Sequence, residues 1–191
     1  MPVSVLIIVT GAPCTGKTTL AARFAADLGW PLLHKDGIKE RLFDTLGWSD
    51  RAWSKQLGLA TYAVLFYAVE SVLRGAGSLV VESNFKPAWH ADRFRDLQRA
   101  YGFVPVQVCC HADRNVLLAR FKTRLESGER HPGHVDHDYL PEFEASLLND
   151  DSAPMDLDGP VLEVDTSDFA ALDYAALLAR LRAALESRKN H

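Results

Sequence analysis

Two kinds of segment alternate along the chain. Short apolar runs without polar interruption predict strands covered on both faces, and longer segments with apolar positions at helical spacing predict helices. The predicted strands are residues 3–9, 31–34, 78–82, 104–110 and 161–164, and the predicted helices are residues 17–29, 37–47, 50–74, 87–99, 113–127, 141–149 and 172–187. This alternation predicts an α/β fold in which helices cover both faces of a parallel sheet, with ligands at the carboxyl ends of the strands.

The whole chain, residues 1–191, is expected to form one domain. Its apolar content of 48% is enough for a substantial core, and the sequence has no internal repeat or low-complexity tract. Residues 129–138 are polar and rich in turn-forming residues, so they predict a mobile loop. The acidic, proline-containing stretch 149–160 predicts a connection before the last strand.

Composition indicates the compartment. The formal net charge of −4 gives no general attraction to nucleic acid or anionic membranes. Three cysteines, two of them adjacent, suggest no disulfide framework and fit a reducing cytoplasm. The N-terminal apolar run has no basic leader or cleavage site, and the apolar segment 59–69 is too short to span a bilayer. We therefore expect a cytoplasmic protein that does not enter a membrane.

The stretch GAPCTGKT at residues 11–18 carries the strongest chemical signal. It matches the Walker A pattern G-x-x-x-x-G-K-[ST] and lies between a predicted strand and a predicted helix, the setting of a phosphate-binding P-loop. Its glycines allow backbone N–H groups to point at phosphate oxygens, and the helix start adds its positive dipole end. Lys17 is expected to contact the β- and γ-phosphates, and Thr18 to bind Mg²⁺. The expected nucleotide-binding residues here are Gly11, Ala12, Pro13, Cys14, Thr15, Gly16, Lys17, Thr18 and Thr19.

Two other classes of P-loop protein lack support in the sequence. A GTPase switch needs an N-K-x-D segment that reads the base and a D-x-x-G segment after a strand, and neither is present. A ring-forming ATPase normally carries a helical domain beyond its core, for which 191 residues leave little room. These absences favour a kinase that uses ATP and Mg²⁺.

Asp36 comes at the end of the second predicted strand. A carboxylate there would face the γ-phosphate across the crevice, where it could orient an acceptor hydroxyl or accept its proton. The alternative is a helix N-cap, a role that Asp favours. Lys39 and Arg41 follow within two turns and could bind an anionic acceptor, with Arg41 the stronger candidate; otherwise both are solvated helix charges.

Glu82 ends the third predicted strand. An acidic residue beside a phosphate loop can hold Mg²⁺, usually through a water molecule, so Thr18 and Glu82 are the predicted metal-binding pair. The alternative is an ordinary charge at the end of a strand. Asn84 and Phe85 follow and are expected to line the acceptor side of the site.

Three arginines follow the fourth predicted strand. Arg120 and Arg124 are four residues apart, so they share one face of a predicted helix, and Arg130 lies in the next loop. Phosphoryl transfer spreads negative charge over the transferred group, and arginines from a closing lid can stabilise that charge and exclude water. Arg124 and Arg120 are therefore predicted to bind the nucleotide and to act in catalysis with Lys17 and Asp36. A solvated helix face is the alternative.

Four stretches, GAPCTGKTT, HKDGIKERLF, VVESNF and ARFKTRLESGERHPGH, together resemble a known family. They resemble the P-loop kinases grouped under an AAA-domain label, which are similar to the kinase half of polynucleotide kinase, to zeta toxins and to chloramphenicol phosphotransferase. The resemblance implies a three-layer P-loop kinase fold with a five-stranded parallel sheet of order 2-3-1-4-5, an arginine-bearing lid at about residues 120–140, and ATP with Mg²⁺. It also implies that Asp36 activates the acceptor and that Arg120 and Arg124 lie where such kinases contact phosphate.

One departure bears on the acceptor. The polynucleotide kinases in this comparison have an arginine three residues after the aspartate, whereas this chain has Lys39 there and Arg41 two residues further on. A nucleic-acid acceptor is therefore not favoured, in agreement with the negative net charge.

Three histidines stand three residues apart in the stretch RHPGHVDHD. His131, His134 and His137, with the interleaved Asp136 and Asp138, have the side chains that zinc prefers. Contacts to the nucleotide or the acceptor, and a plain solvated loop, are the two other interpretations.

The sequence thus predicts a phosphotransferase that moves the γ-phosphate of ATP to a hydroxyl of a small molecule, working as a monomer or homodimer. One alternative is a 5′-hydroxyl kinase for polynucleotides or nucleosides. The other, from a different class, is a nucleotide-binding regulatory module that has no acceptor.

Overall fold

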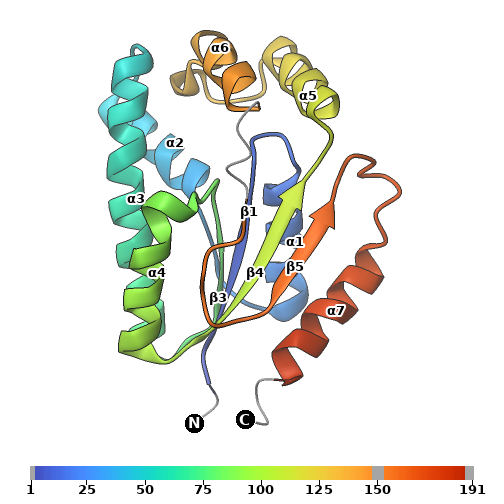
Figure 1. Cartoon of the computed structure of the whole chain (residues 1–191). Coiled ribbons are helices and arrows are strands. Elements are labelled where there is room, and N and C mark those ends of the chain that lie inside the picture. The colour runs from blue at the N-terminus through green and yellow to red at the C-terminus, as the bar shows by residue number, and fades with distance from the viewer. Residues whose placement is uncertain (1–2, 148–152, 188–191) are drawn as a thin grey trace.

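A parallel sheet forms the centre of the molecule (Figure 1). The computed structural model describes residues 3–147 and 153–187. Its strands are β1 (Val5–Gly11), β2 (Leu32–His34), β3 (Leu79–Glu82), β4 (Val104–His111) and β5 (Val161–Asp165). They lie in the order β2-β3-β1-β4-β5 and each neighbouring pair is parallel, which confirms the predicted five-stranded sheet and its order.

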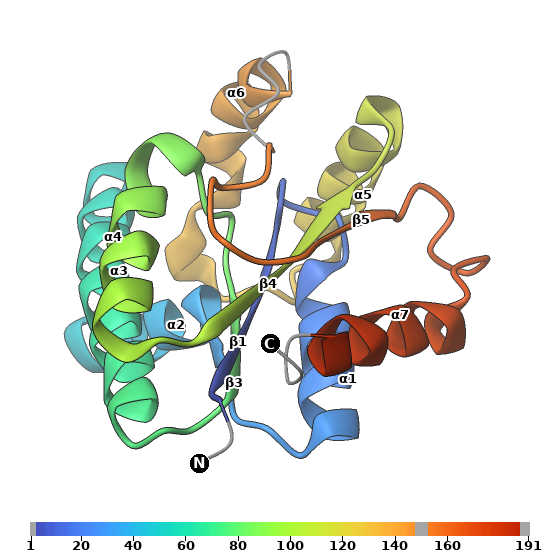
Figure 2. The ribbon, with the colours of Figure 1, turned by 60° about the horizontal axis from the view of Figure 1, so that its bottom comes forward.

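Helices cover both faces of this sheet, which confirms the three-layer α/β architecture. The helices are α1 (Lys17–Leu28), α2 (Lys35–Leu46), α3 (Arg51–Arg74), α4 (Pro87–Tyr101), α5 (Arg114–Ser127), the short 3-10 helix η1 (Pro132–His134), α6 (Asp136–Ser146) and α7 (Tyr174–Ser187). Figures 1 and 2 show α1 and α7 on one face and α3 and α4 on the other. α5 and α6 lie beyond the carboxyl ends of the strands.

The core divides along β1, because successive side chains of a strand point to opposite faces. Val5, Ile7 and Val9 pack in the cluster that includes α1 and α7. Leu6 and Ile8 pack in the cluster that includes α3 and α4. Residues 6–9 have no exposed surface, as their unbroken apolar run predicts for a strand covered on both faces.

The register of the sheet aligns the carboxyl ends of β1, β2 and β3. Glu82 of β3 lies opposite Val9 of β1 and opposite His34 of β2. The phosphate loop directly follows β1, and Asp36 lies just beyond β2. The phosphate loop, Glu82 and Asp36 therefore meet at the same edge of the sheet.

The start of α2 differs from the prediction. The helix begins at Lys35 rather than Gly37, and its N-cap is His34, whose Nδ1 accepts a hydrogen bond from the Gly37 N–H at 3.0 Å. The alternative interpretation of Asp36 as the N-cap is therefore wrong. Asp36 instead lies in the first turn, where the helix dipole favours a negative charge.

The connection between α5 and α6, residues 128–135, overlaps the stretch 129–138 that was predicted to be a loop, and α6 already begins at Asp136. The connection contains η1 and is docked on α2 through two histidines. The imidazole of His131 stacks on the ring of Phe43 at 5.2 Å between centroids, and that of His134 meets the same ring edge-on at 5.5 Å. His131 Nε2 lies 3.3 Å from Asp44 Oδ1, and His134 Nε2 lies 3.0 Å from Glu40 Oε1.

These contacts bear on the interpretations of the histidine stretch, although His134 also lines the cavity of the candidate site, so contact with a ligand stays a prediction. Two of the three histidines bind the protein itself, and His137 is exposed in α6. Within residues 3–147 and 153–187, no three His, Cys, Asp or Glu side chains are grouped so that they could hold a metal ion. The described chain thus gives no support to zinc binding. The predicted helix 141–149 begins earlier, at Asp136, and residues 148 and 149 lie outside the described residues.

α3 is longer than the apolar segment 59–69 that it contains. Among the described helices it alone is long and apolar enough to cross a membrane, so the shortness of that segment does not settle the question. Length and composition of this kind also describe a core helix. α3 contributes Leu65, Phe66 and Val69 to the apolar cluster beneath the sheet.

Replacing Gly133 with alanine is expected to loosen the docked connection. A Cβ at this position would lie 2.6 to 2.9 Å from ring atoms of Phe43, so either the ring or the connection must move. We expect Gly133→Ala to lose about 1–3 kcal/mol of unfolding free energy and to be cleaved faster by trypsin at Arg130. Gly75→Ala is the matched control, since its Cβ would make an ordinary contact at 3.5 Å. Equal cleavage of Gly133→Ala and the parent protein would contradict the docking.

Candidate active site

The phosphate loop has the backbone that its glycines predict. Gly11 and Gly16 both have positive φ angles, 147° and 76°. A Cβ at Gly11 would lie 2.2 Å from the carbonyl oxygen of Cys110, and one at Gly16 would lie 2.5 Å from the ring of Phe169. Only glycine fits at either position, because both the space and the backbone conformation exclude a side chain.

The loop is held by its own hydrogen bonds. The Thr15 hydroxyl, fully buried, donates to the carbonyl of Ala12 at 2.9 Å, and Lys17 Nζ donates to the same carbonyl at 3.4 Å. Gly16 caps α1 without any side-chain acceptor. The N–H groups of the first turn of α1 are therefore left for a ligand, as in an anion site at a helix N-terminus.

Thr18 and Glu82, the predicted metal-binding pair, lie side by side. The Thr18 hydroxyl donates to Glu82 Oε2 at 3.0 Å, and Lys17 Nζ lies 3.8 Å from Glu82 Oε1. Glu82 is 3% exposed. Mg²⁺ prefers hard oxygen ligands and usually takes only one or two from protein, with phosphates and water completing the shell. A hydroxyl and a buried carboxylate beside a phosphate loop fit this ion.

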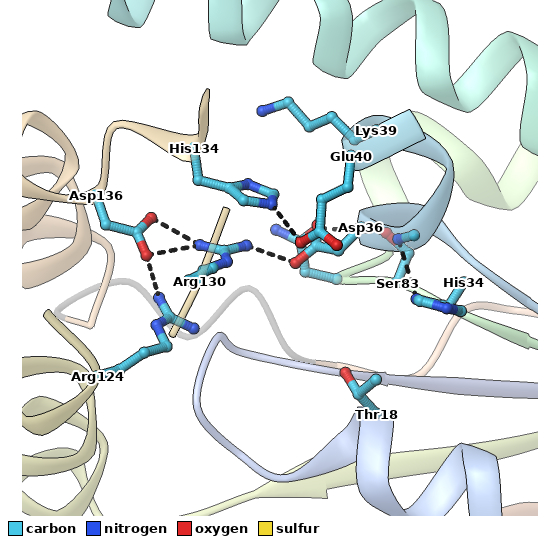
Figure 3. Close-up of polar contacts among 12 residues, drawn as sticks. Thr18, His34, Asp36, Lys39, Glu40, Ser83, Arg124, Arg130, His134 and Asp136 are labelled. Carbon is cyan, nitrogen blue, oxygen red and sulfur yellow. Dashed lines mark hydrogen bonds and ion pairs between the residues drawn. The ribbon is translucent and has the colours of Figure 1, made fainter. Parts of the chain in front are cut away.

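Asp36 belongs to a chain of alternating charges (Figure 3). Arg130, from the connection, lies between two carboxylates: its Nη2 donates to Asp36 Oδ2 at 2.5 Å and its Nη1 donates to Asp136 Oδ1 at 2.6 Å. Arg124 of α5 completes the chain, with Nη2 at 3.3 Å from Asp136 Oδ2. The chain joins α2, the connection, α6 and α5 across the mouth of the site.

The pKa of Asp36 follows from this arrangement. Burial raises the pKa of its carboxyl, but the nearby charges of Arg130, His134, Lys35 and Lys17 outweigh burial and hold the pKa well below its usual range. Asp36 is thus ionised around neutral pH. Its charge is matched by Arg130 and not by a proton.

Arg124 has hydrogen-bonding capacity that the protein does not use. Its Nε and Nη2 are buried and have no hydrogen-bond partner within the described part of the chain. Nη2 is near enough to Asp136 for an ion pair, but the angle does not make a hydrogen bond. Phosphate oxygens beside Lys17 would satisfy these donors, as the prediction for Arg124 requires.

Arg120 is used differently. It donates to the carbonyl of Cys14 at 3.4 Å and to the carbonyls of Thr166 and Ser167 at 2.8 and 3.1 Å. These bonds tie the loop after β5 to the phosphate loop. The structure therefore gives Arg120 a supporting role beside the phosphates, in place of the catalytic contact predicted for it.

One cavity of about 640 Å³ holds most of the predicted site. Its lining includes the predicted residues Pro13, Cys14, Gly16, Lys17, Thr18, Thr19, Asp36, Glu82, Asn84 and Arg124. Arg41 is not among them: its side chain is 87% exposed and pairs with Asp44 on the outer face of α2. Phe85 is also absent, because its ring packs in the core against Phe66 and Phe94. Phe85 lines a neighbouring cavity of about 550 Å³ instead, which shares Asn84 with the first. The acceptor-binding predictions for Arg41 and Phe85 are corrected accordingly.

Three further residues from α2 and α3 line the same cavity and were not predicted: Lys35, Ser54 and Tyr62. Lys39, the weaker candidate beside Arg41 for an anionic acceptor, also lines it. Arg130 contacts Asp36 more directly than either arginine that was ranked ahead of it. A signal for Lys39 was present in the helix periodicity. Lys39 and Phe43 are four residues apart and both are buried, so they share the inner face of α2.

The fold and the site together define a P-loop kinase: a phosphate loop after the central strand of a β2-β3-β1-β4-β5 sheet, with a Thr–Glu pair beside it and arginines above it. The chain belongs to the AAA-domain family whose model matches residues 6–147.

Comparison with solved structures agrees with this assignment. A "putative kinase" from Chloroflexus aurantiacus j-10-fl is 36% identical, with a TM-score of 0.85 over 96% of this chain and 99% of that one. Kti12 from Chaetomium thermophilum, in complex with ADP-AlF3, is 20% identical with a TM-score of 0.67, over 94% and 98% of the two chains. A gluconokinase from Sinorhizobium meliloti 1021 is 17% identical with a TM-score of 0.54, over 99% and 94%. The last two likenesses concern the fold alone. No curated protein matches the sequence.

Replacing the buried Lys39 with methionine is expected to stabilise the protein. Burial lowers the pKa of Lys39 to about 8, with the charge of Lys35 adding to the effect, so its ammonium destabilises the folded state. We expect Lys39→Met to gain about 1 kcal/mol or more at pH 7 in chemical denaturation. The gain should be full below pH 8 and shrink as the pH rises toward 10.5, where unfolded lysine also loses its proton. Arg41→Met, on the exposed face of α2, is the control; a loss of stability in Lys39→Met alone would contradict this account.

Proposed function

We propose that this protein transfers the γ-phosphate of ATP to a hydroxyl group of a small-molecule acceptor. The observation that carries the proposal is the shared cavity: the Asp36 carboxylate opens into the same space as Lys17 and the Thr18–Glu82 pair. Phosphoryl transfer needs an acceptor hydroxyl in line with a phosphate that cations hold, and this cavity offers both halves.

The donor half would be filled by the nucleotide. Backbone N–H groups of residues 11–16 and the start of α1 would surround the β-phosphate, and Lys17 would contact the β- and γ-phosphates. Thr18 and Glu82 would hold Mg²⁺, which neutralises charge that develops on the transferred group. The unpartnered Nε and Nη2 of Arg124 would donate to phosphate oxygens. We also propose that residues 1–191 act as one domain, with the region 120–140 as a lid over this half.

On the acceptor side, Asp36 would orient the hydroxyl. Its lowered pKa makes it a weak base, which suits a loose transition state in which the nucleophile keeps its proton until late. The Arg130 guanidinium that now pairs with Asp36 is close enough to turn toward the phosphate that is transferred. The carboxylate would then exchange a guanidinium partner for the acceptor hydroxyl.

The names of similar structures support a small acceptor. One is a gluconokinase and another is described as a sugar kinase from Janibacter sp. HTCC2649. The identities of 17% and 14% are too low to carry over a substrate. They agree with the size of the cavity, which suits a nucleotide and a small polar molecule better than a polymer.

Asp36→Asn is expected to bind ATP with unchanged affinity and to lose kcat by roughly 10²–10⁴-fold, because an amide orients a hydroxyl without accepting its proton. ATP binding would be measured by calorimetry and transfer by the mass gain of one phosphate in a pool of sugars, polyols and nucleosides. Asp92→Asn, which changes an exposed carboxylate on α4, is the matched control and should retain full activity. Lys17→Ala should lose transfer altogether. A kcat of Asp36→Asn within threefold of the parent would rule out the role given to Asp36.

Glu82→Gln is expected to raise the Mg²⁺ concentration that gives half-maximal transfer by about 10–100-fold. The reason is that a neutral amide replaces the charged partner of the Thr18 hydroxyl and of the metal-bound water. The measurement is a Mg²⁺ titration of the transfer rate at saturating nucleotide. Asp165→Asn removes an exposed carboxylate at the end of another strand, β5, and should leave the titration unchanged. If both variants titrate like the parent, Glu82 does not take part in metal binding.

A further inference from the structure

The cavity that contains Asp36 is strongly cationic. Among the described residues, its lining has eight Lys and Arg side chains against three Asp and Glu: Lys17, Lys35, Lys39, Arg51, Lys55, Lys86, Arg124 and Arg130 against Asp36, Glu82 and Asp136. The phosphate loop and the arginines above it account for the part that faces the nucleotide. Lys39, Arg51 and Lys55 lie on α2 and α3, on the side of Asp36 where an acceptor must enter.

The carboxylates of the cavity already have cationic partners. Asp36 and Asp136 pair with Arg130, and Glu82 lies beside Lys17. At the rim, Arg51 and Lys55 both pair with Glu142 of α6 at 2.9 and 2.8 Å. Lys35 and Lys39 are different, because within residues 3–147 and 153–187 neither has a carboxylate within 4.0 Å of its ammonium. Part of the excess positive charge of the acceptor side thus resides on these two lysines.

Lys39 is the more unusual of the two. It is only 5% exposed, and its Nζ donates to Ser54 Oγ at 2.8 Å and lies 5.1 Å from the ring centre of Phe43. An ammonium has three N–H donors, and in the described part of the chain Ser54 is the one protein acceptor that Nζ meets. Burying such a group without an anion costs free energy that neither Ser54 nor an aromatic ring restores.

The position of Lys39 relative to Asp36 is also fixed. The two residues are three apart in α2, so their side chains lie on neighbouring parts of one helix face, about 5–6 Å apart at Cβ. Lys35, at the start of the same helix, lies over the ring of Tyr62 at 5.1 Å and lines the cavity as well. If the hydroxyl of a small molecule contacts Asp36, the other polar groups of that molecule would therefore lie near the ammonium groups of Lys35 and Lys39.

We propose that the acceptor carries an acid group, a carboxylate or a phosphate, and that Lys39, with Lys35, binds this group while the acceptor hydroxyl lies at Asp36. The inference rests on the proposed function, since it names the class of acceptor for the same site. It assigns Lys39 a binding role and gives Ser54 the task of aiming the ammonium into the cavity. A neutral sugar or alcohol would leave Lys39 buried and without a counter-ion.

The first experiment tests the anion site without requiring turnover. The protein is saturated with Mg²⁺ and the non-hydrolysable β,γ-methylene analogue of ATP, so the nucleotide phosphate positions are filled, and inorganic phosphate is titrated by calorimetry. We expect one phosphate to bind the parent protein and Arg41→Met alike, and Lys39→Met to bind it at least tenfold more weakly. Arg41→Met loses the same charge from the exposed face of the same helix. Equal phosphate binding by Lys39→Met and the parent, or no binding by either, would overturn the proposal.

The second experiment identifies the acid group. Each acceptor is offered as a matched set: a neutral sugar, the corresponding sugar acid with a carboxylate, and the corresponding sugar phosphate. We expect kcat/KM to be at least tenfold higher for one acidic member than for the neutral member, and the preferred member tells carboxylate from phosphate. Lys39→Met should raise KM for that acceptor at least tenfold while KM for ATP stays within twofold. Equal use of the neutral and acidic members would overturn the proposal.

The two experiments also keep the two proposals apart. If phosphate binds through Lys39 but no acceptor of any charge is phosphorylated, the transferase function fails and the anion site remains. If a neutral acceptor is phosphorylated as well as its acids, or with no dependence on Lys39, the function remains and the inference fails.

Discussion

Glu82 is the point on which the geometry of the site depends. Its backbone lies opposite Val9 and His34 in the sheet register, and its buried carboxylate binds Thr18 and faces Lys17. A shift of one residue in this register would turn the carboxylate to the other face of the sheet. The carboxylate would then no longer lie between the phosphate loop and the start of α2. The parallel pairing of β1, β2 and β3 therefore sets the distance between the phosphate loop and Asp36.

Charge balance governs the other side of the site. The Asp36 carboxylate is paired with a cation, Arg130, which comes from a segment 94 residues away in the chain and lowers the pKa of Asp36. The same guanidinium holds Asp136, so the connection is anchored both through its charges and through the histidines that enclose Phe43. The docked arrangement is therefore stabilised by charged groups of the candidate site, and undocking the connection must separate them.

The sequence predicted a parallel sheet and the phosphate loop because these depend on local patterns: unbroken apolar strands, helix spacing and a loop whose glycines are needed for backbone shape. The order of the strands was implied only by the resemblance to P-loop kinases. The sequence did not predict the docked connection, since the stacking of His131 on Phe43 joins residues far apart in the chain. It also favoured Arg41 over Lys39, because the pattern of apolar and polar positions does not distinguish a buried lysine from an exposed one. The pairing of Asp36 with Arg130 was not predicted either, because an ion pair between residues far apart in the chain produces no periodic pattern in the sequence.

This contrast explains why the donor half of such a site is recognisable and the acceptor half is not. Phosphates are held mainly by backbone N–H groups, so the loop that binds them needs particular residues at particular spacings. In the proposed function the acceptor would be held by side chains that α2, α3 and the connection bring together, and each of these could change without disturbing the loop. One fold can therefore keep a single phosphate donor and change its acceptor through a few buried side chains. If the acceptor is acidic, as proposed, Lys39, buried one turn from Asp36, is such a side chain in this protein.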